Sequence, residues 1–265
     1  GSSDPLSRAV VTFASPTRGV VSADPTFELA WDTATWLGVP LRKVPLTYDY
    51  RHDVKAMLAA GPDAGLFYVC TPNNPTGTVT PLEDIAWLVR NKPAGSKVLV
   101  DEAYIHFTTQ PSATALFAES DDVIVLRTFS ELFGMAGMRM GYALSHPANI
   151  AKMQRYDGDV QSGSLPLPSL VCATASLGEA GTIAQRRAEL QANRSFVTEE
   201  IRRRGYTVLP SEANMVMIDW GGPPAKSMRE AFRKQGVEIG AFGARQRRHG
   251  AVPTTDRDGR YEFAD

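Results

Sequence analysis

The first 145 residues of the chain alternate short apolar runs with longer segments of helical spacing, and this alternation is what most constrains the fold. The runs expected to form strands are 19–22, 41–44, 66–70, 98–100, 123–126 and 141–144, and the helical segments include 27–37, 54–60 and 82–91. Strands that alternate with helices favour a mostly parallel sheet covered on both faces. We therefore expect an α/β fold built as a three-layer sandwich.

Polar residues gather where these expected strands end. Asn73 and Asn74 follow one strand, Asp101 and Glu102 follow another, and Ser130 follows a third. In open α/β sheets, ligands bind beyond the carboxyl ends of the strands. The sequence therefore predicts a ligand site at this edge of the sheet.

The rest of the chain has a different pattern. It predicts a long charged helix at 182–204, strands at 206–209 and 215–220, a helix at 223–235 and a further segment at 237–240. Gly205 is well placed to end the long helix.

These patterns divide the chain into four parts. We interpret 1–150 as a large domain, 151–204 as connecting helices and 205–240 as a small α+β domain. Residues 241–265 are rich in Arg, Gly, Pro and Asp and poor in apolar side chains, so we expect a disordered tail there.

Charge and cysteine content exclude several classes of protein. The 265 residues include 28 Lys and Arg against 29 Asp and Glu, which gives no electrostatic reason to expect nucleic acid or a membrane surface as partner. No signal peptide opens the chain, and no apolar run approaches the roughly 18 residues of a membrane helix. Cys70 and Cys172 lack the spacing of a disulfide framework or a zinc site. We expect a cytoplasmic protein without a metal.

Three polar residues near the strand ends each allow two interpretations. Asp101 follows an apolar strand, where a buried carboxylate costs on the order of several kcal/mol unless a cation pairs with it. That cation is either an ordinary basic side chain or the protonated nitrogen of a heterocycle. Tyr104 is either a half-buried core tyrosine or a second contact to the same ligand. Asn74 either shapes a turn or donates to a phenolate-like oxygen.

The stretch 128–142 is the most informative part of the sequence. Its glycines allow tight backbone turns. Ser130 supplies a hydroxyl and Arg139 a guanidinium fork, which together suit a phosphate group. The alternative is that both are plain surface residues.

Taken together, these stretches resemble the fold-type I, pyridoxal-phosphate-dependent aminotransferases of class I/II, and most of all their histidinol-phosphate aminotransferase branch. The matching elements occur in family order between Gly1 and about Gly240: Asn74-Pro75-Thr76-Gly77, Asp101-Glu102-Ala103-Tyr104, and Ser130, Gly134, Gly137 and Arg139 at the family's spacing. Each element is weak alone, and together they are highly specific. The resemblance implies a homodimer that uses pyridoxal phosphate to move an amino group between a small amino donor and a 2-oxo acid.

The resemblance also implies which residues hold the cofactor ring. Asp101 would pair with the pyridinium nitrogen and keep the ring an electron sink. Asn74 and Tyr104 would hydrogen-bond the ring's 3′ oxygen, and Phe27 would stack on the ring.

The resemblance assigns the phosphate to a second group of residues. Ser130 and Arg139 would bind it, helped by Ser2 and Ser3, which resemble a phosphate loop that opens a helix. The alternative for this Gly-Ser-Ser start is a scar left by cloning. Asn214 matches a motif of the small domain near the substrate side.

The largest departure from the family is Glu131. The family has a lysine directly after the serine, and that lysine forms the internal Schiff base and moves the proton during transfer. Glutamate cannot form an imine, and its negative charge should weaken cofactor binding. Lys97 and Lys152 are the nearest lysines in the sequence, and neither falls in a motif that would aim it at the cofactor.

The chain ends depart from the family as well. The family has an N-terminal arm before the position of Gly1, and beyond Gly240 a strand with an arginine that binds the substrate carboxylate. Neither is recognisable here, and a shifted reading frame is one explanation for the tail.

Three interpretations of function remain open. The first is an aminotransferase, acting on an amino acid or an amino-alcohol phosphate with a 2-oxo acid, whose activity is lost or crippled because Glu131 replaces the lysine. The second is a non-catalytic protein that binds the cofactor or a partner. The third keeps catalysis, with Glu131 accepting a proton from a preformed cofactor–amine adduct. The retained Asp101, Ser130 and Arg139 argue against a complete loss of ligand binding.

Overall fold

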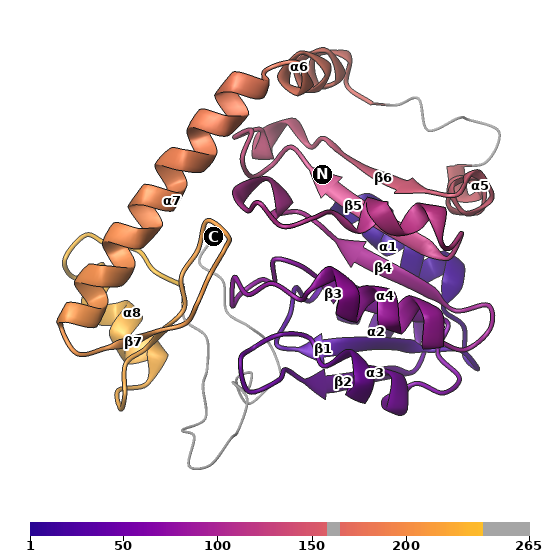
Figure 1. The fold of residues 1–265 in the computed structure, drawn as a ribbon, viewed down its shortest axis with the longest axis horizontal. Helices are drawn as coiled ribbons and strands as arrows, with labels where there is room; N and C mark the ends of the chain where they lie inside the picture. The colour runs from indigo at the N-terminus through magenta and orange to yellow at the C-terminus, as the bar shows by residue number, and fades with distance from the viewer. Residues whose placement is uncertain (158–164, 241–265) are drawn as a thin grey trace.

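A computed structural model of the chain describes residues 1–157 and 165–240. Its main feature is a six-stranded sheet in the order β2-β1-β3-β4-β5-β6 (Figure 1). The strands are β1 Val20–Asp24, β2 Leu41–Pro45, β3 Leu66–Cys70, β4 Lys97–Asp101, β5 Val123–Thr128 and β6 Gly141–Ser145. The first five are parallel, and β6 pairs antiparallel with β5. The predicted mostly parallel α/β sheet is confirmed.

Helices cover both faces of this sheet. One face packs against α1 Ser3–Phe13, α2 Leu29–Leu37 and α5 Pro147–Gln154, and the other against α3 Val54–Ala60, α4 Leu82–Asn91 and the 3-10 helix η2 Ala113–Ala118. The remaining 3-10 helices are η1 Ile105–Phe107, η3 Ala136–Met138 and η4 Arg155–Asp157. The three-layer sandwich is therefore confirmed.

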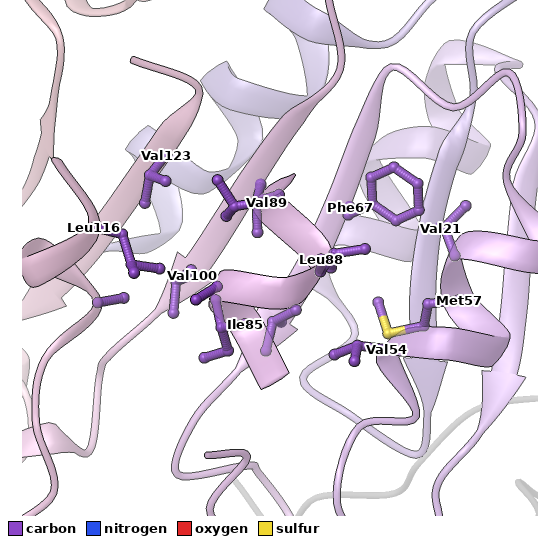
Figure 2. Packing of buried hydrophobic residues seen from close by; sticks show 14 of the residues in the cluster. Val21, Val54, Met57, Phe67, Ile85, Leu88, Val89, Val100, Leu116 and Val123 are labelled. Carbon is purple, nitrogen blue, oxygen red and sulfur yellow. The ribbon is translucent and has the colours of Figure 1, made fainter. Parts of the chain in front are cut away.

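The two-residue period of the strands explains why both faces are buried. In β3, Phe67 and Val69 join the cluster beneath α3 and α4, where Phe67 lies near Met57 and Leu88 (Figure 2). Leu66 and its alternate neighbours in the same strand point to the opposite cluster. Because β3 is buried on both faces, successive residues are apolar, and the strand forms the continuous apolar run seen in the sequence.

The C-terminal part consists of α6 Leu167–Leu177, α7 Ala180–Arg203, the strand pair β7 Thr207–Val208 and β8 Ile218–Asp219, and α8 Ala225–Arg233. Figure 1 shows α7 running from α6 beside the sheet to β7 and α8. Arginines on α7 fasten it to neighbouring backbone: Arg186 donates to the Leu132 carbonyl at 3.1 Å and Arg187 to the His106 carbonyl at 2.7 Å.

The strands expected at 206–209 and 215–220 shrink to two residues each. The intervening segment is held instead against the loops that follow β3 and η1, because the Glu212 amide donates to the Gly77 carbonyl at 2.8 Å and Thr108 donates to the Glu212 carboxylate. The segment 237–240 is neither helix nor strand, since the Val237 amide closes the end of α8 on the Phe232 carbonyl. The tail expected at 241–265 lies outside the described residues.

Within the described parts of the chain, the helices are too short or too polar to cross a membrane. Cys70 is buried at the end of β3 and Cys172 is exposed on α6, and both are free thiols.

A buried polar hub centred on Asn73 fixes the loop that follows β3. The Asn73 side chain donates to the Pro25 carbonyl at 3.2 Å and to Thr76 Oγ1 at 2.9 Å, while its oxygen accepts from Thr26 at 2.7 Å and lies 3.2 Å from His52 Nε2. Asn73 is fully buried, so each of these bonds is made away from water. The next residue of the loop, Asn74, takes no part in these side-chain bonds, so its side chain can contact a different part of the fold.

His52 in this hub predicts a loss of stability in mild acid. Burial lowers the pKa of His52 to about 4, whereas an unfolded histidine titrates near 6.5. Between these values the unfolded chain binds more protons, so stability present above pH 6.5 falls as the pH approaches 4, by on the order of 2–3 kcal/mol. Urea denaturation at pH 7 and 4.5 should show this extra loss in the wild type and not in His52→Gln. An equal loss in both proteins would contradict it, because other titrating groups are shared.

Candidate active site

A cavity of about 240 Å³ opens at the carboxyl edge of the sheet. Three consecutive parallel strands contribute their last residues to it: Cys70 from β3, Asp101 from β4 and Thr128 from β5. The register places Cys70 opposite Asp101. The other residues that line the cavity are Gly1, Ser2, Ser3, Phe27, Ala103, Tyr104, Ser130, Glu131, Ala136 and Arg139. Six chain segments thus meet where the sequence predicted a site.

One end of the cavity suits an anion. Helix α1 begins at Ser3, and no side chain caps the amides of its first turn, which carry the positive end of the helix dipole. A Cβ placed on Gly1 would lie 3.0 Å from Arg139 Nη2 and 3.3 Å from Ser130 Oγ, so the helix start, the hydroxyl and the guanidinium share one corner.

The antiparallel strand β6 brings this corner together. Because β6 runs opposite to β5, its first residue, Gly141, pairs with Thr128 at the edge where β5 ends. A Cβ on Gly141 would sit 2.5 Å from Gly1 C and from Ser2 N, closer than any real contact. Only glycine allows the start of the chain to lie against β6 in this way.

Asp101 lies deep in the cavity and is 2% exposed. Tyr68 Oη donates to its Oδ2 at 3.1 Å, and the Ala103 amide donates to its Oδ1 at 3.1 Å. Burial, assisted by the charges of Glu102 and Glu131, raises the pKa of Asp101 to about 6, although the hydrogen bonds from Tyr68 and Ala103 act to lower it. Among the described residues, Asp101 has no ion-pair partner. A cationic ligand would therefore stabilise its charged form.

Tyr104 and Asn74 form a hydrogen-bonded pair at the wall of the cavity. Asn74 Nδ2 donates to Tyr104 Oη at 3.1 Å, and Tyr104 itself lines the cavity. Burial raises the pKa of the Tyr104 hydroxyl, and so does the charge of Glu131. The half-buried ring of Phe27 supplies an aromatic surface to the same wall.

Glu131 also lines the cavity, next to Ser130. Its Oε2 accepts a hydrogen bond from Asn214 Nδ2 at 3.1 Å, and it makes no ion pair within the described part of the chain. Among the residues that the structure describes, no lysine lines the cavity. Lys97 lies at the other end of β4, 2.5 Å from Asp122, and Lys152 is exposed on α5.

Asn214 lies outside this cavity. It lines a second one of about 160 Å³, formed by α7 and residues 214–216. Its hydrogen bond to Glu131 links a residue that lines the smaller cavity to one that lines the larger cavity.

Sequence reasoning missed three residues of the site: Cys70 and Thr128, which line the cavity, and Tyr68, which donates to Asp101. The sequence did contain a signal for them. Tyr68 and Cys70 alternate along one face of the predicted strand 66–70, and Cys70 is its last residue. Thr128 lies two residues beyond the predicted strand 123–126. Ala103 and Ala136 carried no signal, since alanine has no functional group.

Comparison with known proteins agrees with the resemblance seen in the sequence. Residues 1–260 match the family described as aminotransferase class I and II. The chain is 30% identical to the histidinol-phosphate aminotransferase of Symbiobacterium thermophilum, across 98% of this chain and 72% of the relative. It is 36% identical to the aromatic amino acid aminotransferase of Cutibacterium acnes, across 67% of this chain and 51% of the relative. The chain thus spans about half the length of the latter protein.

Solved structures show the same fold. The histidinol-phosphate aminotransferase of Sinorhizobium meliloti in complex with pyridoxal-5′-phosphate matches with a TM-score of 0.78 and 25% identity, over 89% of this chain and 65% of that one. The enzyme of the same name from Clostridium acetobutylicum matches with a TM-score of 0.81 at 19% identity, over 90% and 71% of the two chains, which shows the fold alone.

Proposed function

The chain belongs to the class I and II aminotransferases, and from that membership we propose that its cavity holds pyridoxal phosphate without a covalent bond. One observation carries the proposal. A single cavity combines a corner that suits a phosphate with a buried carboxylate that has no ion-pair partner in the described residues. Such a cavity fits a ligand with a phosphate and a basic ring nitrogen.

The anion corner would hold the phosphate. The open amides at the start of α1, the Ser130 hydroxyl and the Arg139 guanidinium could each donate a hydrogen bond to a phosphate, and two of the three also carry positive charge or dipole. Ser2 and Ser3 belong to this corner because they open the helix.

The ring would lie between Asp101 and Phe27. Asp101 would keep the ring nitrogen protonated, and Phe27 would cover the ring and exclude water. Tyr104, held by Asn74, would donate to the ring's 3′ oxygen. When bound, pyridoxal phosphate supplies an electron sink and a carbonyl carbon that can carry an amino group.

Glu131 limits what this site can do. Its carboxylate cannot attack a carbonyl to form the bond that a lysine amine forms, so the cofactor would be held by non-covalent contacts alone. We propose that this chain transfers amino groups slowly or not at all. The proposed reaction class is transfer between an amino acid or amino-alcohol phosphate and a 2-oxo acid, and the activities named for the two curated relatives support it.

A non-catalytic binding protein is the second candidate. The hydrogen bond from Asn214 to Glu131 favours this candidate. In that bond, the residue at the lysine position and the residue expected on the substrate side are each other's partners. Measurable turnover of a 2-oxo acid by the unmodified chain would exclude this candidate.

We also propose that the protein is a cytoplasmic homodimer. The free thiols support a reducing compartment. Helix α6 supports self-association, because Leu167 is 69% exposed and Val171 is 59% exposed, and exposed apolar side chains gathered on one helix favour an interface.

Equilibrium dialysis with pyridoxal phosphate tests the proposed function. The wild type should bind one equivalent per chain, and Asp101→Asn should weaken binding about 10- to 100-fold, because the buried partner of the ring nitrogen loses its charge. Asp121→Asn is the matched control, since Asp121 is 72% exposed and lies outside the cavity. Equal affinity of the two variants would contradict the proposed role of Asp101.

Two glycine variants test the phosphate corner in the same assay. Gly141→Ala should weaken binding about tenfold, because its Cβ displaces the start of α1. Gly137→Ala should change little, since its Cβ meets no atom within 4 Å.

A further inference from the structure

We propose that the cavity selects the amine form of the cofactor, pyridoxamine 5′-phosphate, over the aldehyde form, because Glu131 places a carboxylate without a cationic partner on its wall. The inference rests on the proposed function, since it requires that the cavity hold a vitamin B6 phosphate. It concerns only which chemical form of that group binds.

The hydrogen bonds of Glu131 leave its charge uncompensated. Its one hydrogen-bond donor in the described chain is the neutral amide of Asn214, at 3.1 Å. Its negative charge raises the pKa of both Asp101 and Tyr104, which line the same cavity. The cavity wall therefore carries two carboxylates together with Arg139 and the start of α1.

Each polar group of the cavity suits a different part of one ligand. The anion corner suits the phosphate, Asp101 suits the ring nitrogen, and Tyr104 suits the ring oxygen. Glu131 is the charged residue left over, and it accepts a hydrogen bond from Asn214, the residue expected on the substrate side. The remaining polar substituent of the ring is the one-carbon arm that ends in either an aldehyde or an amine.

The charge of that arm decides which form Glu131 favours. An aldehyde oxygen carries partial negative charge, so a carboxylate repels it. A protonated amine carries a full positive charge and three donors, so it can pair with Glu131 through a charge-assisted hydrogen bond. The two forms differ little in size, and the preference is therefore electrostatic.

Affinities for three phosphates of similar size test the proposal. We would titrate the protein at pH 7.5 with pyridoxamine, pyridoxine and pyridoxal 5′-phosphates and follow the intrinsic fluorescence. The amine form should bind about tenfold or more tightly than the neutral alcohol, and the aldehyde no more tightly than the alcohol. The intact mass after borohydride treatment identifies any aldehyde that has reacted with surface lysines, so that reaction is not counted as binding.

Two charge-neutralising variants assign the preference to Glu131. Glu131→Gln keeps the shape and removes the charge, and it should bring the three affinities within about threefold of one another. Glu83→Gln removes the same charge from an exposed position on α4 and should keep the wild-type order.

The outcomes separate this inference from the proposed function. If the aldehyde binds as tightly as the amine to the wild type, or if the preference survives in Glu131→Gln, the inference is wrong and the cofactor cavity stands. If none of the three phosphates binds, the proposed function itself fails and the inference fails with it.

Discussion

Glu131→Lys should convert this chain into a protein that carries pyridoxal phosphate covalently. The new amine would lie on the wall of the cavity beside Ser130, where no lysine lies in the unmodified chain. It can attack the cofactor aldehyde and release water, which a carboxylate cannot do. We expect borohydride to fix one cofactor per chain at residue 131, as seen by peptide mass mapping, and amino-group transfer to rise by roughly 10³-fold or more.

Glu131→Gln is the matched control, because it removes the charge without supplying an amine. It should show neither the fixed cofactor nor the gain in transfer. If the unmodified chain already carries a borohydride-fixed cofactor at a cavity residue, Glu131 is not what prevents covalent attachment. If Glu131→Lys fixes the cofactor and still transfers no amino group, then parts of the family's enzyme beyond this chain's cavity limit turnover.

Arg127→Met should destabilise the fold by about 3–5 kcal/mol, the usual cost of stranding a buried charge. Arg127 donates to Glu102 at 3.0 and 3.1 Å, and the Glu102 side chain is only 1% exposed. Ser112 and the Ala113 amide also donate to this carboxylate, and neither can neutralise it. Urea denaturation should report the loss as a lower midpoint.

Arg90→Met provides the comparison for this variant. Arg90 pairs with Glu119 at 3.2 Å, with both side chains more than half exposed, so its loss should cost less than about 1 kcal/mol. Equal costs for the two variants would show that Glu102 finds water or another donor. The stranded charge should also raise the pKa of the adjacent Asp101, because Glu102 already raises it in the wild type.

The large sheet was predictable because its signal is local. Most strands of the sheet are short apolar runs bounded by turn residues, and β3 was placed at its full length, Leu66–Cys70. The small strand pair was predicted too long, because contacts from Glu212 to Gly77 and Thr108 decide where pairing stops. No pattern within 206–220 contains those partners.

The candidate site was predictable to the extent that polar residues follow strands. The structure brings Asp101, Ser130 and Glu131 into one cavity, as the motif order indicated. Their roles toward a cofactor stay predictions. Bonds such as the one from Asn214 to Glu131 depend on side chains that approach from elsewhere in the fold. Contacts between residues far apart in the chain produce no repeating pattern in the sequence, so a single sequence does not predict them.

The two cavities are built from separate stretches of the described chain. The larger is lined only by residues up to Arg139, whereas the smaller is lined by α7 and residues 214–216. Apart from Asn214, which bonds Glu131, residues that line the smaller cavity can therefore change without replacing any residue that lines the larger one. Such a chain can diverge in what the smaller cavity accepts while the residues of the larger cavity stay the same.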